Sequence, residues 1–185
     1  MTISPEDRAK LVALARQAVE AQVNGHPRPT VRDAEGIVGE KRGCFVTLTN
    51  SGRLRGCIGT FHPTDPLGEM IVQMGASAAR DPRFVTDPVT PEEIPQLTIE
   101  VSVLSKLEKT RHPEQLQIGR DGIYIVCGGR SGCFLPEVAT DQGWSAEEFL
   151  NYCCAHKAGL SPDAWRFADA EVYIFTSEKF TECEK

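Results

Sequence analysis

The chain has 185 residues, of which 41% are hydrophobic and 25% are charged, with a formal net charge of −6 and a pI near 5.3. This acidic balance argues against a general nucleic-acid-binding or membrane-surface protein, because both partners require a basic face. No apolar run approaches the roughly 20 residues of a membrane span, and the first residues lack the basic and then apolar order of a secretory signal. We therefore expect a cytoplasmic protein without a membrane anchor.

A helix is predicted near the beginning of the chain. Ser4 supplies a capping hydroxyl, Pro5 suits the first helical position, and acidic residues follow. Apolar residues then recur at helical spacing up to Asn24 and Gly25, which form a stop signal. Residues 26–40 contain prolines and glycines without periodicity, so we predict a loop there.

Two β-rich runs follow, residues 43–49 and 54–61. They flank Asn50, Ser51 and Gly52, a short connection in which the Asn and the Gly can adopt positive φ. The spacing predicts a β-hairpin.

The rest of the chain mixes helices with strands. The predicted elements are a helix opened by Asp65-Pro66 and ending near Arg80, strands at 97–104, 122–127 and 132–135, a helix from the capping box at Ser145 to Gly159, and a final strand at 172–180. Hairpins dominate this order, so we predict an α+β fold with a mainly antiparallel sheet and packed helices rather than a doubly wound parallel sheet.

The second hairpin strand reads R-L-R-G-C-I-G-T-F and is the strongest functional candidate. Residues 41–64 carry four Lys or Arg and no acid, a local charge of +4. Such a segment would attract an anionic ligand, although a solvated hairpin with basic residues explains the charge as well. Strict alternation places Arg55 and Cys57 on one face with Gly59, and places Leu54 and Ile58 on the core face.

Cys57 is a candidate nucleophile on this strand. A guanidinium group close to a thiol favours the thiolate, which is the reactive form. The glycines Gly56 and Gly59 weaken a strand unless something approaches its backbone closely, for example a ligand. The alternative is a small thiol packed in a sheet. Of the histidines available as a base, His62 comes at the end of the same strand but with opposite alternation unless a bulge intervenes, and His26, His112 and His156 are not placed by the sequence.

A second charged cluster, Asp81-Pro82-Arg83-Phe84, follows the second long helix. Arg83 could bind an anion together with Arg55, or it could simply pair with Asp81 at a turn. The seven cysteines, without an export signal, are expected to be reduced thiols. Cys127 with Cys133, or Cys154 with His156, match no common ligand spacing, so we predict no metal site.

Several motifs together resemble the AMMECR-type domain, known in bacteria as AmmeMemoRadiSam system protein A. The resembling segments, in order, are G-C-F-V-T-L at 43–48, the LRGCIG motif with T-F at 54–61, D-P-R-F at 81–84, I-E-V-S-V-L at 99–104, L-P-E-V-A at 135–139, and K-A-G-L with D-A-W between 157 and 165. The resemblance covers nearly all of residues 1–185. It implies a single domain of two unequal lobes with a cleft between them near the signature.

The resemblance carries no settled biochemical activity or cofactor, and it singles out Leu54, Arg55, Gly56, Cys57, Ile58 and Gly59. We therefore keep two functional hypotheses open beside a structural one, in which the signature is a folding device and Gly56 and Gly59 serve tight strand packing. The first is an enzyme or enzyme component in which Cys57 is the reactive thiol and Arg55, Gly56, Gly59 and Arg83 bind a small anionic ligand. The second is a non-catalytic binding or adaptor module, for which the bacterial name implies a radical SAM enzyme and a Memo-like protein as partners.

Overall fold

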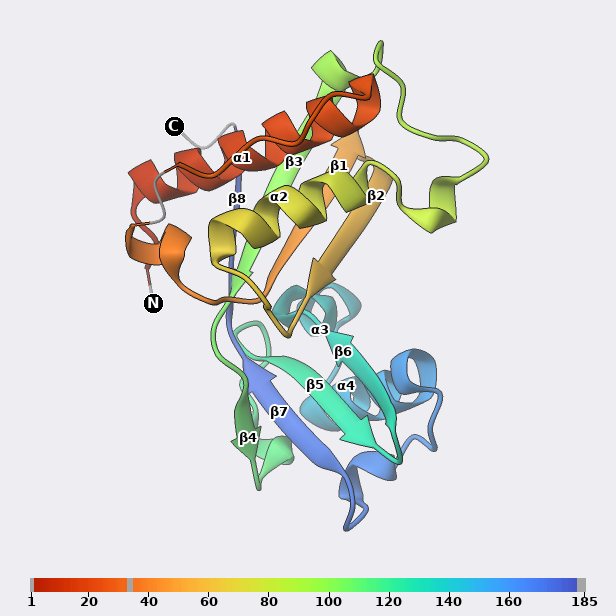
Figure 1. Ribbon diagram of the computed structural model, residues 1–185. Coiled ribbons are helices and arrows are strands. Elements are labelled where there is room, and N and C mark those ends of the chain that lie inside the picture. Colours follow the sequence, from red (N-terminus) through yellow and green to blue (C-terminus); the bar gives the residue numbers. More distant parts are fainter. Residues whose placement is uncertain (1, 33–34, 183–185) are drawn as a thin grey trace. The chain divides into compact units, whose positions relative to one another are not determined.

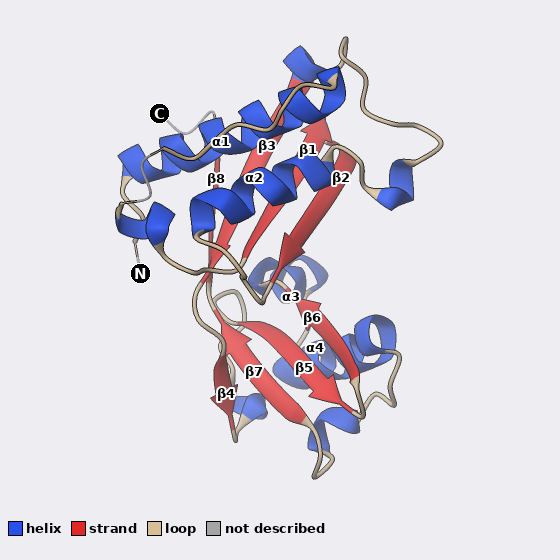
Figure 2. Cartoon of the chain, viewed as in Figure 1, coloured by secondary structure: helices blue, strands red, loops and turns tan. Residues whose placement is uncertain are grey.

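The computed structural model describes residues 2–32 and 35–182, and it divides the chain into two compact units of unequal size. The first unit comprises Met1–Leu104 with Glu178–Lys185, and the second comprises Ser105–Ser177. Each unit contains one four-stranded sheet with helices (Figures 1 and 2). The predicted α+β class with mainly antiparallel pairing is confirmed, because β1 pairs antiparallel with both of its neighbours and β5 does the same in the second sheet.

The first unit is a sheet with two long helices on one face (Figure 1). The strand order is β2-β1-β3-β8, so β2 is an edge strand. The elements are α1 (Pro5–Asn24), β1 (Cys44–Asn50), β2 (Arg53–Thr60), α2 (Leu67–Ala78), β3 (Leu97–Leu104) and β8 (Ser177–Thr181), with short 3₁₀ turns at Gly36–Gly39, Pro82–Phe84 and Ile94–Gln96.

The core of the first unit is formed between these helices and the sheet. Leu11 of α1, Ile71 of α2 and Val46 of β1 are completely buried in one cluster. The helices approach each other at Gly75, where a Cβ would lie 3.0 Å from the Ala15 carbonyl oxygen. A larger residue at this position would push α2 away from α1.

The predicted start of α1 is confirmed in detail. The Ser4 hydroxyl accepts a hydrogen bond from the Asp7 backbone N–H at 3.1 Å, and Gly25 ends the helix with a φ of 70°. The hairpin is also present, but its turn is shorter than predicted. Asn50 belongs to β1, and Ser51 and Gly52 take φ values of 50° and 79°. Two successive residues of positive φ are typical of a type I′ turn, whose twist matches that of the strands.

The second unit contains a sheet of order β4-β7-β5-β6. Its elements are β4 (Glu108–Thr110), β5 (Gly122–Cys127), β6 (Arg130–Phe134), α3 (Pro136–Gln142), α4 (Ala146–Tyr152), a π-helical turn (Cys153–Ala158) and β7 (Glu171–Phe175), with 3₁₀ turns at Pro113–Gln115 and Ala164–Arg166. Ile123, Phe149 and Leu150 are completely buried in its core.

Some predicted boundaries are wrong. The single strand predicted at 172–180 is two strands, β7 and β8, which belong to different sheets. The helix predicted from Ser145 changes to π-helical geometry at Cys153. The second long helix begins at Leu67, and Asp65 does not cap it but accepts hydrogen bonds from the Thr64 and Gln73 side chains. In the described part of the chain, no helix combines the length and the apolar character that crossing a bilayer requires.

Candidate functional site

The signature strand β2 does not alternate regularly, because a bulge interrupts its pairing with β1. Thr49 pairs with Leu54 and Leu48 pairs with Gly56, which leaves Arg55 as the extra residue. An extra residue shifts the side chains before it to the other face of the sheet. Leu54 is accordingly 37% exposed, whereas Arg55 is only 4% exposed. The predicted faces of these two residues are therefore wrong.

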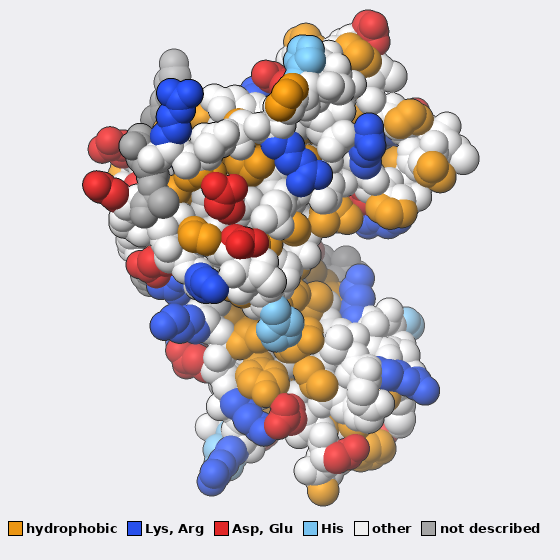
Figure 3. Space-filling model, in the orientation of Figure 1, with side chains coloured by type: hydrophobic (Ala, Val, Ile, Leu, Met, Phe, Trp, Pro, Cys, Tyr) orange, Lys and Arg blue, Asp and Glu red, His pale blue; other side chains and the backbone are white. Residues whose placement is uncertain are grey.

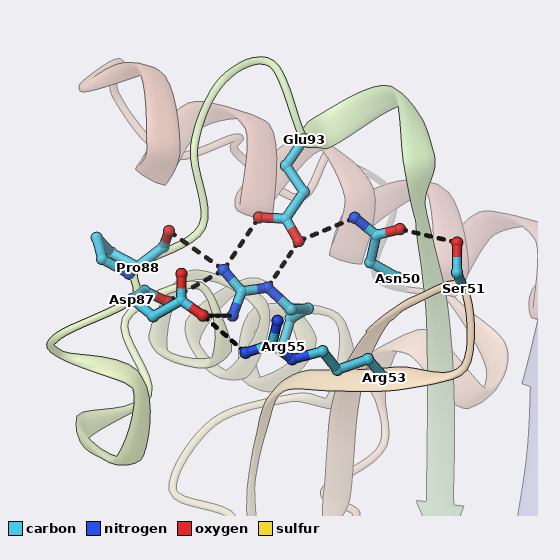
Figure 4. A network of polar contacts seen from close by, with 7 residues as sticks. All are labelled: Asn50, Ser51, Arg53, Arg55, Asp87, Pro88 and Glu93. Atoms are coloured by element: carbon cyan, nitrogen blue, oxygen red, sulfur yellow. Dashed lines mark hydrogen bonds and ion pairs between the residues drawn. The ribbon is translucent and has the colours of Figure 1, made fainter.

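Arg55 is held by the loop before β3 (Figure 4). Its Nε and Nη2 donate to the two carboxylate oxygens of Glu93 at 2.6 and 3.1 Å. Its Nη1 donates to Asp87 Oδ2 at 3.0 Å, and Nη2 also reaches the backbone carbonyls of Asp87 and Pro88. The hydrogen bond to Glu93 raises the pKa of Arg55, and the same bond lowers the pKa of Glu93. All three guanidinium nitrogens are thus occupied by the chain itself.

At the two signature glycines, neighbouring parts of the chain occupy the space that a side chain would take. A Cβ on Gly56 would lie 2.1 Å from the carbonyl oxygen of Ala78, where the end of α2 crosses the strand. A Cβ on Gly59 would lie 2.2 Å from the Phe45 ring. Both positions therefore require glycine for internal packing, and the space above their Cα atoms holds no room for a ligand.

Cys57 lies on β2 beyond the bulge and is partly buried. It pairs with Thr47 of β1, whose hydroxyl donates to Cys57 Sγ at 3.2 Å. Among the described residues no histidine hydrogen-bonds to this thiol, and no group of three or more His, Cys, Asp or Glu side chains could hold a metal ion. The polar neighbour of the thiol is therefore a hydroxyl group.

The backbone of Cys57 faces away from β1, toward the open edge of the sheet, where Asp81 and Arg83 satisfy it. The Cys57 N–H donates to Asp81 Oδ2 at 3.0 Å, and Arg83 Nη2 donates to the Cys57 carbonyl at 3.2 Å. Asp81 and Arg83 also bind each other, with 2.5 Å between Nη2 and Oδ2. The sequence-predicted pair thus exists, and it is attached directly to the signature strand.

The two members of this pair differ strongly in exposure. The Asp81 side chain is 1% exposed and the Arg83 side chain is 57% exposed. The hydrogen bond from Arg83, with help from the Cys57 N–H, lowers the pKa of Asp81 to about 2. Arg83 uses its Nε and Nη2 for Asp81, whereas its Nη1 has no hydrogen-bond partner in the described part of the chain. Asp81 therefore fixes a guanidinium group whose outer edge is open.

Sequence reasoning singled out Cys57, Arg55 and Arg83 but missed Thr47, Asp87 and Glu93. The hairpin register contains the signal for Thr47, because counting back from the turn pairs it with Cys57. Asp87 and Glu93 reach Arg55 across 32 and 38 residues, and no local pattern indicates such contacts.

Comparisons with known proteins agree with this architecture. The AMMECR1 family model matches residues 12–180. A protein of Thermofilum pendens is 40% identical over 97% of this chain and 92% of its own length. A protein of Thermococcus gammatolerans is 44% identical over 93% of this chain and 88% of its own length. The crystal structure of an uncharacterized protein, PH0010, from Pyrococcus horikoshii is similar with a TM-score of 0.86 and 40% identity, covering 97% of this chain and 93% of that one. With its signature strand and its two units, the chain belongs to the AMMECR1 family.

Proposed function

We propose that this chain is an enzyme or enzyme component in which the Cys57 thiol reacts with a small anionic substrate. The observation that carries the proposal is the Thr47 hydroxyl group, which donates a hydrogen bond to Cys57 Sγ. This hydrogen bond holds the sulfur in one position beside β1, and a nucleophile must be held in position in the same way. Cys57 is also only partly buried.

Arg83 is proposed to bind the anionic group of the substrate. Its guanidinium group contacts the Cys57 carbonyl and presents Nη1 to solvent, so an anion bound there lies near the thiol. Asp81 acts as a positioning residue that holds Arg83. In this proposal Arg55, Gly56 and Gly59 shape the strand and do not contact the ligand themselves.

Two alkylating probes of different charge test the proposal. Iodoacetate and iodoacetamide each form one S–C bond with a thiolate and release iodide, but only iodoacetate is an anion. We expect Cys57 to be alkylated faster than Cys133, the other partly buried thiol among the described residues, at neutral pH in the same protein sample. Peptide mass spectrometry after timed quenching measures both rates.

Variants of Thr47 and Arg83 test separately the hydrogen bond to the thiol and the binding of the anionic group. Thr47→Val should slow the alkylation of Cys57 by both probes about tenfold, because the hydrogen bond that holds the sulfur is lost. Arg83→Gln should lower the ratio of the iodoacetate rate to the iodoacetamide rate about threefold, as expected for one exposed ion pair. Lys41→Gln changes the net charge equally and should leave this ratio unchanged.

Two outcomes together would contradict the reactive-thiol proposal. If Cys57 reacts no faster than Cys133 and Thr47→Val has no effect, the reactive-thiol proposal is wrong. A non-catalytic binding module would then be the better description of the chain.

A further inference from the structure

A pocket of about 460 Å³ lies beside the signature strand in the first unit, and it is independent of the Cys57 thiol. This volume falls in the range of small-molecule sites in proteins. Its walls are mainly apolar and are formed by Ala79, Pro82, Phe84, Val85, Pro88 and Val89. Three charged residues, Arg55, Arg80 and Asp81, complete it.

Apolar side chains of this region remain open to solvent. Val85 is 77% exposed, the largest exposed fraction among the large hydrophobic side chains of the described residues. Pro82 and Pro88 are also exposed, whereas Val89 belongs to the core below. The space-filling view shows hydrophobic atoms on the segment that follows α2, at the upper right (Figure 3). A bound apolar group would remove this surface from water.

Both ends of the segment that forms the pocket are fixed. Asp81 is tied to the Cys57 N–H at one end, and Asp87 and Glu93 are tied to Arg55 at the other (Figure 4). Phe84 lies between them, with the Arg55 guanidinium carbon 5.8 Å from its ring centroid. The walls are therefore preorganised, which lowers the entropic cost of binding.

Of the charged residues that line the pocket, one cation has no ionic partner among the described residues. Arg55 is balanced by Asp87 and Glu93, and Asp81 is balanced by Arg83. Arg80 is exposed and lies beside the side-chain amide of Gln22. Because an amide is neutral, no residue that the structure describes compensates the positive charge of Arg80.

Three carbonyl groups at the end of α2 form hydrogen bonds within the chain. Carbonyl groups at a helix C-terminus normally direct negative potential outward. Here the carbonyls of Gly75, Ser77 and Ala78 accept hydrogen bonds from the N–H groups of residues 79, 80 and 81. These three oxygens thus already have hydrogen-bond donors within the chain.

We infer that this pocket binds a small aromatic carboxylate, with its ring against Phe84, Val85 and the prolines and its carboxylate on Arg80. The flat faces of Phe84, Pro82 and Pro88 suit a planar ring better than a branched alkyl group. The inference goes beyond the proposed function, because no step requires Cys57.

Fluorescence titration with two related probes tests this inference. Anilinonaphthalene sulfonate has an aromatic body with one negative charge, and phenylnaphthylamine has the same ring system without the charge. We expect the wild-type protein to bind both probes, and phenylacetate to displace them. Arg80→Met should weaken binding of the sulfonate about tenfold and leave binding of the neutral probe unchanged.

Further variants test whether the probes bind in this pocket. Val85→Asp should weaken both probes, whereas Phe167→Ser, which removes another exposed hydrophobic side chain in the second unit, should change neither. Cys57→Ser should also leave both affinities unchanged, so this test is separate from that of the thiol. Circular dichroism confirms that each variant is folded. Equal affinities in wild type, Arg80→Met and Val85→Asp would overturn the inference, as would failure of phenylacetate to compete.

Discussion

Arg55 belongs to the signature strand and Arg83 to the turn that follows α2, and each is held by carboxylates. Arg55 is buried, and all three of its guanidinium nitrogens donate to Glu93, Asp87 and Pro88. Arg83 is more than half exposed and shares only one edge with Asp81. The number of acceptors around an arginine, rather than its place in a motif, decides whether it can bind a ligand. By this criterion Arg55 is fully used within the fold, whereas Arg83 is the residue that we propose for ligand binding.

The largest effect that tests this comparison is expected from Arg55→Ala. The substitution leaves the Glu93 carboxylate, 15% exposed, without its cationic partner. Breaking a buried ion pair from one side costs about 3–5 kcal/mol. Urea unfolding should therefore show a large loss of stability.

Arg53→Ala is the matched control for that experiment. Arg53 lies on the same strand and also donates to Asp87, but its side chain is 71% exposed. Its removal should cost less than about 1 kcal/mol. Equal losses in the two variants would show that burial of Arg55 is not what distinguishes it.

The next largest effect is the dependence of the unfolding free energy on pH that Asp81 causes. The pKa of Asp81 is lowered from 3.8 to about 2, so in this interval the unfolded state binds more protons than the folded state. The stability contributed by Asp81 is therefore complete above about pH 4 and is lost as pH falls toward 2; it amounts to about 2 kcal/mol.

Asp81→Asn isolates this contribution, because the amide keeps an oxygen for the Cys57 N–H but does not titrate. The difference in unfolding free energy between wild type and variant should shrink as pH falls from 4 to 2. A difference that stays constant over this interval would mean that the carboxylate and Arg83 do not form a stabilising pair in the folded state.

The smallest effect tests the bulge. Leu54 is 37% exposed, whereas Ile58 packs against the core of the first unit. Leu54→Ala should cost about 0.5 kcal/mol or less, and Ile58→Ala about 2 kcal/mol. If the strand alternated regularly from Arg53 onward, the two losses would be similar.

Local signals in the sequence predicted much of the fold. Ser4 caps α1, Ser145 and Glu148 form the predicted capping box, and the hairpin lies where Ser51 and Gly52 permit positive φ. Each of these features depends on residues a few positions apart. The strand predicted at 172–180 failed for the opposite reason, since its pattern continues across Thr176 although the chain passes there from one sheet to another.

The candidate site was predicted less completely than the fold. Cys57 and Arg83 were identified from residue type and neighbouring charge. The role of Arg55 could not be predicted, because it depends on a one-residue bulge and on two acids in a distant loop. Gly56 was predicted to let a ligand approach the strand, but the end of α2 lies against it.

The Asp81–Arg83 pair also bears on how the folded chain behaves at high concentration. An edge strand whose N–H and C=O groups are free can recruit a strand from another molecule and begin a fibre. In β2 these groups are occupied at Cys57, halfway along the strand, by a carboxylate and a guanidinium group. The two side chains of the proposed ligand site therefore also block the addition of another strand at this part of β2.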